Sequence, residues 1–420
     1  MEILSTGEKI KRARIFKGIT LKELCEDKIS IAKMSCIENG KAKADRELLE
    51  YIAKKIEIDL DYLVEDVYEQ IINNLALIKK NISSDDDVEE KLKDNLAYAA
   101  QYGYYNLAFE LIHILFTYYI EENKIENIQL IVSEYYDLYQ RDNTEENTII
   151  YFKDMARYLL YNEEYIEAIS YYGKLREMML QKEDYDKAEY CVIAYNEAIC
   201  YQNIGKFKEA YDILSSIIEY VEELKSYEVK GKIYHIYTNV CIKLRKDGVE
   251  EYKKRAYQYE KHNLISLARS YGDYGKYYFA VGEKEKAITE IESGINTFPK
   301  DNKEKYVEFL NSCIEILIAN NEYIVAYEIT EDALNMAIIT DNIRLIERSY
   351  YLKGTILQKL DKYEEAEKYM NLSLDSLFKF GSREERKNRY IDMANLYYKL
   401  GATLDSLKYF NLALTVDKKI

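Results

Sequence analysis

The sequence predicts an all-α protein in which a head of short helices precedes a long array of helical pairs. The 420 residues include only one proline and fifteen glycines, which disfavours a turn-rich β architecture and favours long helices. Small residues also recur at intervals of about 40 residues through most of the chain, and such a period is typical of helical repeat proteins. The length itself exceeds one ordinary core, so several domains or a repeat array are expected.

Start and stop signals divide residues 1 to about 63 into five helical segments. Ser5 or Thr6 can cap TGEKIKRARIFKG, and Thr20 and Glu23 have the capping-box spacing at the start of TLKELCED. Ser30 can cap IAKMSCIE, which ends at an Asn-Gly pair suited to stopping a helix. The segments RELLEYIAKKIEI and LDYL complete a head whose apolar faces are too small to be separate domains.

The ordered positions of GEKIKRARIFKGITLKELCEDKISIAKMSCIENGK, followed by YIA, resemble a helix-turn-helix domain of the phage-repressor type. The resemblance covers the whole head. It implies that residues 31–38 form the recognition helix, whose N-terminal part lies on base edges in the major groove. It also implies a buried structural ion pair between Arg14 and Glu38. Met34 and Ile37, together with Ile31, are expected to form the inward stripe of the recognition helix.

The predicted DNA contacts are small or polar side chains on the outward face of the recognition helix and beside it. They are Thr20, Ser30, Ala32, Lys33, Ser35, Lys41 and Lys43. None is the Gln, Asn or Arg that usually makes bidentate base contacts, so we expect mainly phosphate contacts and some dependence on DNA shape. Residues 1–55 carry 13 Lys+Arg and 9 Asp+Glu, a balance of +4, which leaves −20 for the rest of the −16 chain. The alternative is a head that keeps this fold without binding DNA.

After the head, residues 67–88 are predicted to be a linker helix and joint. They separate a DNA-binding domain at 1–66 from a repeat domain at 89–420 that serves peptide sensing and dimerisation. The stretch NISSDDD in this joint reads as a polar break that caps the next helix.

The repeats are anchored on a small residue that precedes an apolar or aromatic residue by four positions. The anchors are Ala168, Ala210, Gly248, Ala287, Ala326, Ala366 and Ser406, spaced by 38 to 42 residues. The register near 240–255 is open, because Cys241 fits as the small residue of a first helix and would move the anchor to Lys253. This spacing resembles the tetratricopeptide repeat, which implies a right-handed superhelix of about seven to nine helix pairs.

A polar residue recurs two positions before the small residue of several first helices. The four examples are Asn196, Asn239, Asp273 and Asn311. The concave surface of a helical array commonly receives an extended peptide, and Asn can both donate to and accept from a peptide backbone. We therefore predict a ladder of peptide contacts. The alternative is that each side chain bonds a neighbouring turn of its own protein.

Signatures of catalysis and of metal binding are missing from the sequence. It has no Walker A, G-x-G-x-x-G, H-E-x-x-H or G-x-S-x-G motif. Its six cysteines form no C-x-x-C pair, and its three histidines (His113, His235 and His262) offer no zinc spacing. Neither a signal peptide nor a membrane span is recognisable. We expect a cytoplasmic protein that is not an enzyme and uses no cofactor or metal.

The succession of a repressor-type head and tetratricopeptide-like repeats resembles the cytosolic peptide-pheromone receptors of Gram-positive bacteria, the grouping that includes Rgg, PlcR, NprR and PrgX. The stretch ELCEDKISIAKMSCIENGK is itself similar to the head of PlcR-like members. The resemblance implies a homodimeric quorum-sensing transcription regulator that binds promoter DNA and changes conformation on binding a short signalling peptide. The alternative is a peptide- or protein-binding repeat scaffold, or a phage-type lysis-lysogeny peptide receptor, with weak or vestigial DNA binding.

Overall fold

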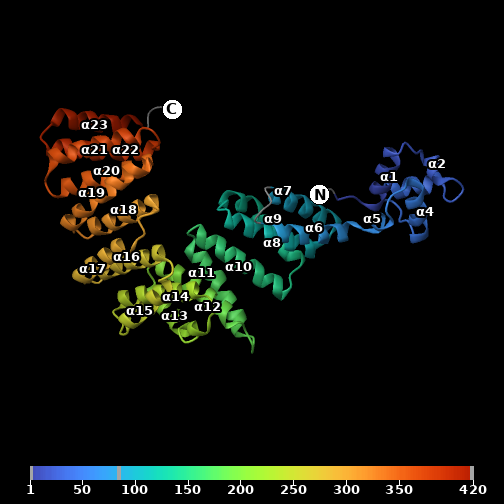
Figure 1. The fold of residues 1–420 in the computed structure, drawn as a ribbon, viewed down its shortest axis with the longest axis horizontal. Helices are drawn as coiled ribbons and strands as arrows, with labels where there is room; N and C mark the ends of the chain where they lie inside the picture. Colours follow the sequence, from blue (N-terminus) through green and yellow to red (C-terminus); the bar gives the residue numbers. More distant parts are fainter. Residues whose placement is uncertain (1–2, 83–86, 417–420) are drawn as a thin grey trace. The chain divides into compact units, whose positions relative to one another are not determined.

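The computed structural model describes residues 3–82 and 87–416, which form helices and turns without a β-strand (Figure 1). The prediction of an all-α, tetratricopeptide-like fold is confirmed, because antiparallel helix pairs follow one another along the described residues. The chain divides into two compact units, Met1–Glu183 and Asp184–Ile420. The first unit contains the head together with several helices of the array, so the compact units follow other boundaries than the domains predicted from the sequence.

The first unit runs from α1 to α11. Its helices are α1 (Thr6–Phe16), α2 (Leu21–Cys25), α3 (Ile31–Glu38), α4 (Arg46–Ile56), α5 (Leu60–Val64), α6 (Val67–Asn81), α7 (Val88–Tyr102), α8 (Tyr105–Glu121), α9 (Ile125–Arg141), α10 (Glu145–Tyr161) and α11 (Tyr165–Leu180). The stretch NISSDDD lies mostly outside the described residues, and Asp87, at its end, makes no side-chain cap to α7.

The second unit runs from α12 to α23. Its helices are α12 (Lys187–Asn203), α13 (Phe207–Ile217), the short 3₁₀ helix η1 (Val221–Glu223), α14 (Tyr227–Leu244), α15 (Val249–Glu260), α16 (Leu264–Ala280), α17 (Lys284–Thr297), α18 (Lys303–Ala319), α19 (Tyr323–Thr340), α20 (Ile343–Lys359), α21 (Tyr363–Leu377), α22 (Arg383–Lys399) and α23 (Thr403–Val416). Each even-numbered helix packs against the helix that follows it, and α14 also packs against α16, and α18 against α20.

The head folds as the five predicted helices around one small apolar core. Ile10, Met34, Ile37 and Ile52 are buried in that core. The predicted caps are present: Ser5 and Thr20 make capping boxes, and the side chain of Ser30 accepts from the backbone of Lys33. These caps satisfy backbone N–H groups that a short helix cannot satisfy by itself.

Small anchors pack the array as predicted. Ala168, Ala210, Ala287, Ala326 and Ala366 are fully buried, each as the fourth residue of a second helix. The partner small residues permit close approach, since a Cβ at Gly275 would lie 2.6 Å from Ile291 and 3.0 Å from the carbonyl of Ala287. Helix pairs of this kind bury their core between neighbours rather than within one pair.

The anchor predicted at Gly248 is wrong. This glycine lies just before α15 in a left-handed conformation with φ +83°. Gly205, Gly282 and Gly401 also have a positive φ, and each lies five residues before its own anchor. A glycine is favoured there because the turn requires a positive φ, not because a helix packs on it. The open alternative, Lys253, keeps the five-residue offset.

Candidate nucleic-acid interface and peptide cavity

The position of α3 is fixed from behind by an ion pair. Arg14 of α1 donates from Nε to Glu38 Oε1 at 2.6 Å and from Nη2 to Oε2 at 2.9 Å. Its third contact, from Nη1 to the carbonyl of Ile19, reaches the turn before α2. The hydrogen bond to Glu38 is the main cause that raises the pKa of Arg14. The pair joins α1 to α3, as the resemblance implied, and holds α3 by its C-terminal end, while the contact to Ile19 adds the turn before α2.

The outer face of α3 is exposed to solvent. Ser30, Ala32 and Lys33 are exposed, whereas Met34 and Ile37 are buried. Ile31 was expected on the inward stripe, and that expectation is wrong, because the side chain is 48% exposed. As the first residue of α3, it lies beyond the end of the core that Met34 and Ile37 reach.

The remaining predicted DNA contacts differ in their exposure and in whether their side chains already make hydrogen bonds within the head. Lys41 and Lys43 are exposed on the segment after α3, and Ser35 is half-buried. Thr20 is exposed, but its hydroxyl donates to Glu23 Oε2 at 2.7 Å and accepts from the Glu23 backbone, so it is already used as a cap. The structure leaves the DNA role of these residues a prediction.

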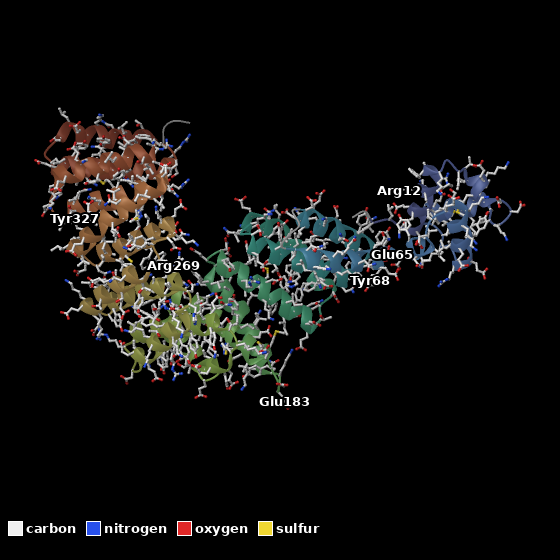
Figure 2. The ribbon with its side chains drawn as sticks, in the orientation of Figure 1. Arg12, Glu65, Tyr68, Glu183, Arg269 and Tyr327 are labelled. Atoms are coloured by element: carbon white, nitrogen blue, oxygen red, sulfur yellow. The ribbon has the colours of Figure 1, made fainter. Side chains whose placement is uncertain are left out.

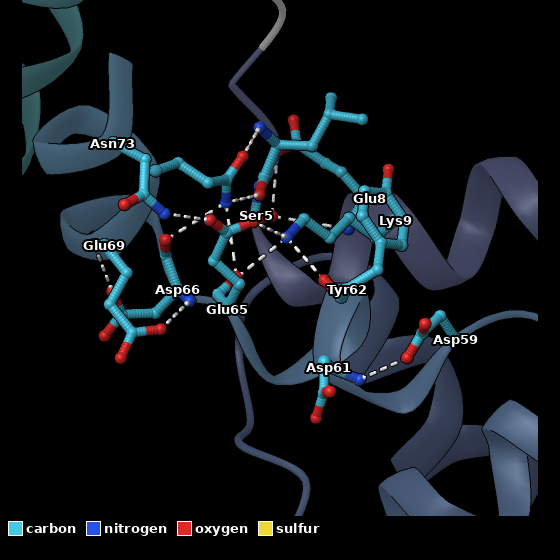
Figure 3. A network of polar contacts seen from close by, with 12 residues as sticks. Ser5, Glu8, Lys9, Asp59, Asp61, Tyr62, Glu65, Asp66, Glu69 and Asn73 are labelled. Atoms are coloured by element: carbon cyan, nitrogen blue, oxygen red, sulfur yellow. Dashed lines mark hydrogen bonds and ion pairs between the residues drawn. The ribbon is translucent and has the colours of Figure 1, made fainter. Parts of the chain in front are cut away.

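A polar network ties the head to the start of α6 (Figure 3). Lys9, which is 1% exposed, donates to the carbonyls of Tyr62 at 2.6 Å and Glu65 at 2.8 Å. Burial is the main cause that lowers the pKa of Lys9. Gln70 of α6 bonds both ways with Leu4, accepting from its N–H at 3.1 Å and donating to its carbonyl at 2.9 Å. Because a cation is stabilised at a helix C-terminus, Lys9 fixes the end of α5 where α6 begins.

A cavity of about 600 Å³ opens between α14, α15 and α16 in the second unit. That volume lies within the range of about 300–1,000 Å³ that is typical of ligand sites. Its lining includes Tyr227, Glu228, Lys232 and His235 of α14, Tyr259 and Glu260 at the end of α15, and Arg269 and Asp273 of α16 (Arg269 is labelled in Figure 2). Most of the lining residues therefore carry a polar or charged group, and carbon atoms also contribute to the cavity surface.

Two of the acidic groups of the cavity have a basic partner, whereas the third does not. Glu228 accepts from Lys232 at 2.6 Å, and Asp273 Oδ2 lies 3.1 Å from His235 Nε2. Glu260 is 6% exposed, and Ser266 donates to its Oε1 at 3.4 Å, but its buried Oε2 has no hydrogen-bond partner among the described residues. Burial is the main cause that raises the pKa of Glu260. The deepest carboxyl of the cavity is also its least satisfied one.

The predicted peptide ladder is only partly presented to solvent. Asp273 lines the cavity and Asn196 is half-buried on α12. Asn239 and Asn311 are 1% and 4% exposed, so the structure corrects their placement on a groove surface. Each bonds inside its own protein, Asn239 Nδ2 to His235 Nε2 at 3.1 Å and Asn311 Oδ1 from Ser349 at 3.3 Å. Asn239 thus bonds the preceding turn of its own helix, which is the alternative left open by the sequence, and Asn311 bonds α20. Asn239 Oδ1 and Asn311 Nδ2 have no hydrogen-bond partner among the described residues.

Sequence reasoning missed the residues that distinguish the cavity. His235 and His262 both line it, although the sequence singled them out only as histidines without zinc spacing. Glu260 carried no signal, because a Glu at the end of a helix is ordinarily a solvated surface residue. Gly231 gave no signal either: a Cβ there would lie 2.9 Å from Cγ of Glu260, so the glycine provides the room in which Glu260 is buried.

No group of three or more His, Cys, Asp or Glu side chains among the described residues could hold a metal ion. No helix in the part of the chain that the structure describes is long and apolar enough to cross a membrane.

Comparison of the sequence with protein-family models and with curated proteins finds no match. Solved structures similar to the chain include the apo quorum sensor NprR from Bacillus thuringiensis, at 15% identity and a TM-score of 0.47, which covers 84% of this chain and 99% of that one. Bacillus thuringiensis PlcR in complex with a peptide and DNA matches at 16% identity and a TM-score of 0.28, over 92% of this chain and 98% of that one.

A Rap protein complexed with Competence and Sporulation Factor matches at 14% identity and a TM-score of 0.45, over 84% of this chain and 98% of that one. NprR and PlcR, named by the sequence resemblance, are thus among the structures that the chain matches. Similarity at these values transfers no ligand or partner to this chain.

Proposed function

We propose that this chain is a cytoplasmic transcription regulator that binds promoter DNA through its head as a homodimer and responds to a short signalling peptide bound by its repeats. The observation that carries the proposal is the outer face of α3. It is exposed, it presents Ser30 and Lys33, and it is held from behind by the Arg14–Glu38 pair.

The charge distribution supports the DNA-binding half of the proposal. The head is mildly positive and the rest of the chain strongly negative, so the polyanion is attracted to the head alone. A homodimer would place two copies of α3 on half-sites one helical turn apart, about 34–36 Å, or a multiple of it. Specificity then comes partly from the spacing of the heads, since α3 carries few side chains able to read a base.

The cavity between α14 and α16 supports the sensing half. It offers donors, acceptors and charges of both signs in a space large enough for several side chains of a peptide. A peptide that binds one conformation of the repeats better than another would change the population of head spacings. A coupling of about 1–3 kcal/mol corresponds to a change in DNA affinity of roughly 5–150-fold.

The test is fluorescence anisotropy of the full chain on double-stranded DNA from upstream of its own gene, across a range of salt concentrations. We expect specific binding whose affinity falls steeply with salt, because several phosphates are neutralised. The same titration with pools of short synthetic peptides should shift the affinity. Binding of peptides without any binding of DNA would favour the repeat scaffold with a vestigial head, and the absence of both would refute the proposal.

A further inference from the structure

The carboxyl of Glu260 is the most buried acidic group of the cavity, and its surroundings leave one of its oxygens without a partner. Glu260 ends α15, packs against Gly231 of α14, accepts a long hydrogen bond from Ser266 at Oε1, and lies near the Ser270 hydroxyl, which also acts to lower its pKa. The other oxygen is buried without a partner. Leaving a buried carboxyl without a hydrogen bond or counter-charge is costly, so natural proteins rarely keep one without a use.

No ion pair joins Glu260 to a basic side chain among the described residues, although the nearby His235 acts to lower the pKa of Glu260. Lys232 pairs with Glu228, and His235 faces Asp273 through Nε2 while its buried Nδ1 stays without a partner. Arg269 lines the same cavity but is exposed and makes no ion pair within the described residues. Glu260 is thus the buried carboxyl of the cavity, whereas Asp273, Lys232 and Arg269 are exposed to solvent around it.

We propose that this cavity takes a positively charged group of a peptide ligand, an ammonium or guanidinium that occupies the space beside Glu260 and is shared with Asp273. The proposal rests on the peptide-sensing function above and names the chemical class that the site selects. The charge can come from a Lys or Arg side chain or from the free amino terminus of the peptide. Tyr227, which is largely exposed at the rim, offers an aromatic surface to the carbon chain that bears the charge.

The experiment uses the full-length protein and three matched pools of short synthetic peptides of otherwise random sequence. One pool has a single position fixed as lysine, the second has norleucine at that position, and the third is the lysine pool with an acetylated amino terminus. Binding is measured as the rise in the thermal unfolding midpoint with pool concentration. We expect the lysine pool to bind about thirtyfold or more tightly than the norleucine pool if the side chain is the source. If acetylation of the amino terminus weakens binding instead, the free amino terminus supplies the positive charge that the cavity binds.

Two variants separate the role of Glu260 from a general effect on the fold. Glu260→Gln keeps the shape and removes the charge, so it should abolish the preference for a cation. It should also leave the midpoint of the free protein unchanged or raised, because an uncompensated buried charge is removed. Glu251→Gln changes an exposed and already paired carboxylate of the same helix outside the cavity, and it should keep the preference.

The outcomes distinguish the inference from the function on which it rests. Pools that bind wild type equally well, with lysine or norleucine and with or without acetylation, would overturn the cation site and leave the peptide function standing. A Glu260→Gln variant that retains the preference, or that loses binding together with stability, would overturn it too. No binding of any pool to wild type would overturn both.

Discussion

Arg14 and Glu38 face each other across the head with two parallel hydrogen bonds, at 2.6 and 2.9 Å, and both side chains are largely buried. They are 24 residues apart in sequence and belong to α1 and α3, so this contact is what makes the orientation of α3 a property of the whole head. Removing one partner leaves the other charge buried and unpaired, which is far more damaging than the loss of an exposed pair.

Arg14→Ala is therefore expected to destabilise the head by about 3 kcal/mol. Hydrogen–deuterium exchange of peptides from α1 and α3, measured in the full chain, should accelerate while peptides from α20 and α21 are unchanged. Lys17→Ala, which removes a pair with the exposed Glu57, is the matched control and should change exchange little. Unchanged protection of α3 in the Arg14 variant would contradict the role assigned to the pair.

Gly7→Ala should disrupt the contact between α1 and α3. A Cβ at Gly7 would lie 2.2 Å from the carbonyl oxygen of Ile37 and 3.1 Å from that of Glu38, and backbone atoms cannot swing aside as a flexible side chain can. We expect a loss of about 1–3 kcal/mol in the free energy of unfolding of the head, together with weaker DNA binding. Denaturant unfolding and the anisotropy assay measure the two effects, and Thr6→Ala beside it serves as the control. Wild-type stability of Gly7→Ala would show that α1 can shift at no cost.

Lys33→Ala should weaken DNA binding without unfolding the head, because Lys33 is exposed on the outer face of α3. A phosphate contact contributes similarly on every sequence, so the loss should be nearly uniform among DNA duplexes. The slope of log affinity against log salt should fall by about 1. Lys54→Ala changes an exposed lysine of α4 outside the predicted set and should leave the slope unchanged. An effect of Lys33→Ala confined to one duplex would indicate a base contact instead.

The hydrogen bonds of Glu89 predict that the stability of the first unit depends on pH. Glu89 accepts from Lys93 at 2.6 Å, Lys124 at 2.9 Å and Tyr119 at 3.0 Å, and the hydrogen bonds from the two lysines are the leading causes that lower its pKa from 4.5 to about 2. A pKa lowered in the folded state means that the network stabilises the fold above pH 4.5 and that this stabilisation is lost as the pH falls toward 2.

The measurement for Glu89 is a difference between two proteins. The free energy of unfolding of wild type should exceed that of Glu89→Gln near neutral pH, and the gap should shrink as the pH is lowered through about 4 to 2. Glu90→Gln, at the exposed neighbouring position, should show no such gap. A gap that stays constant with pH would show that the carboxylate charge is not what the lysines recognise.

The proposed homodimer can be tested at α23, where Leu404, Leu407 and Leu414 are exposed on one face. If a second copy covers this face, Leu404→Asp combined with Leu407→Asp should convert a dimer into a monomer, because charges would be buried at an apolar interface. Light scattering after size-exclusion chromatography gives the mass. Leu130→Asp, at an equally exposed leucine of α9, should not change it. A dimer that survives the double change uses another surface.

Much of the fold followed from the sequence because its signals are local. Caps such as Ser5 and Thr20 act within four residues, and the left-handed glycines Gly205, Gly282 and Gly401 precede their own anchors by a fixed offset, so neither depends on distant packing. The error at Gly248 arose where one residue type serves two purposes, since a glycine permits both close helix packing and a positive φ. Nothing in the sequence alone says which of the two is used.

The sequence by itself determined an all-α chain with a repressor-like head, a repeat near 40 residues and the polar face of α3. The tertiary structure decided which side chains are available: it buries Asn239 and Asn311, exposes Ile31, and places Glu260 against Gly231. The physical reason is distance along the chain. Burial of Glu260 depends on a missing Cβ 29 residues earlier on another helix, and only the packing of α14 against α15 and α16 brings those positions together.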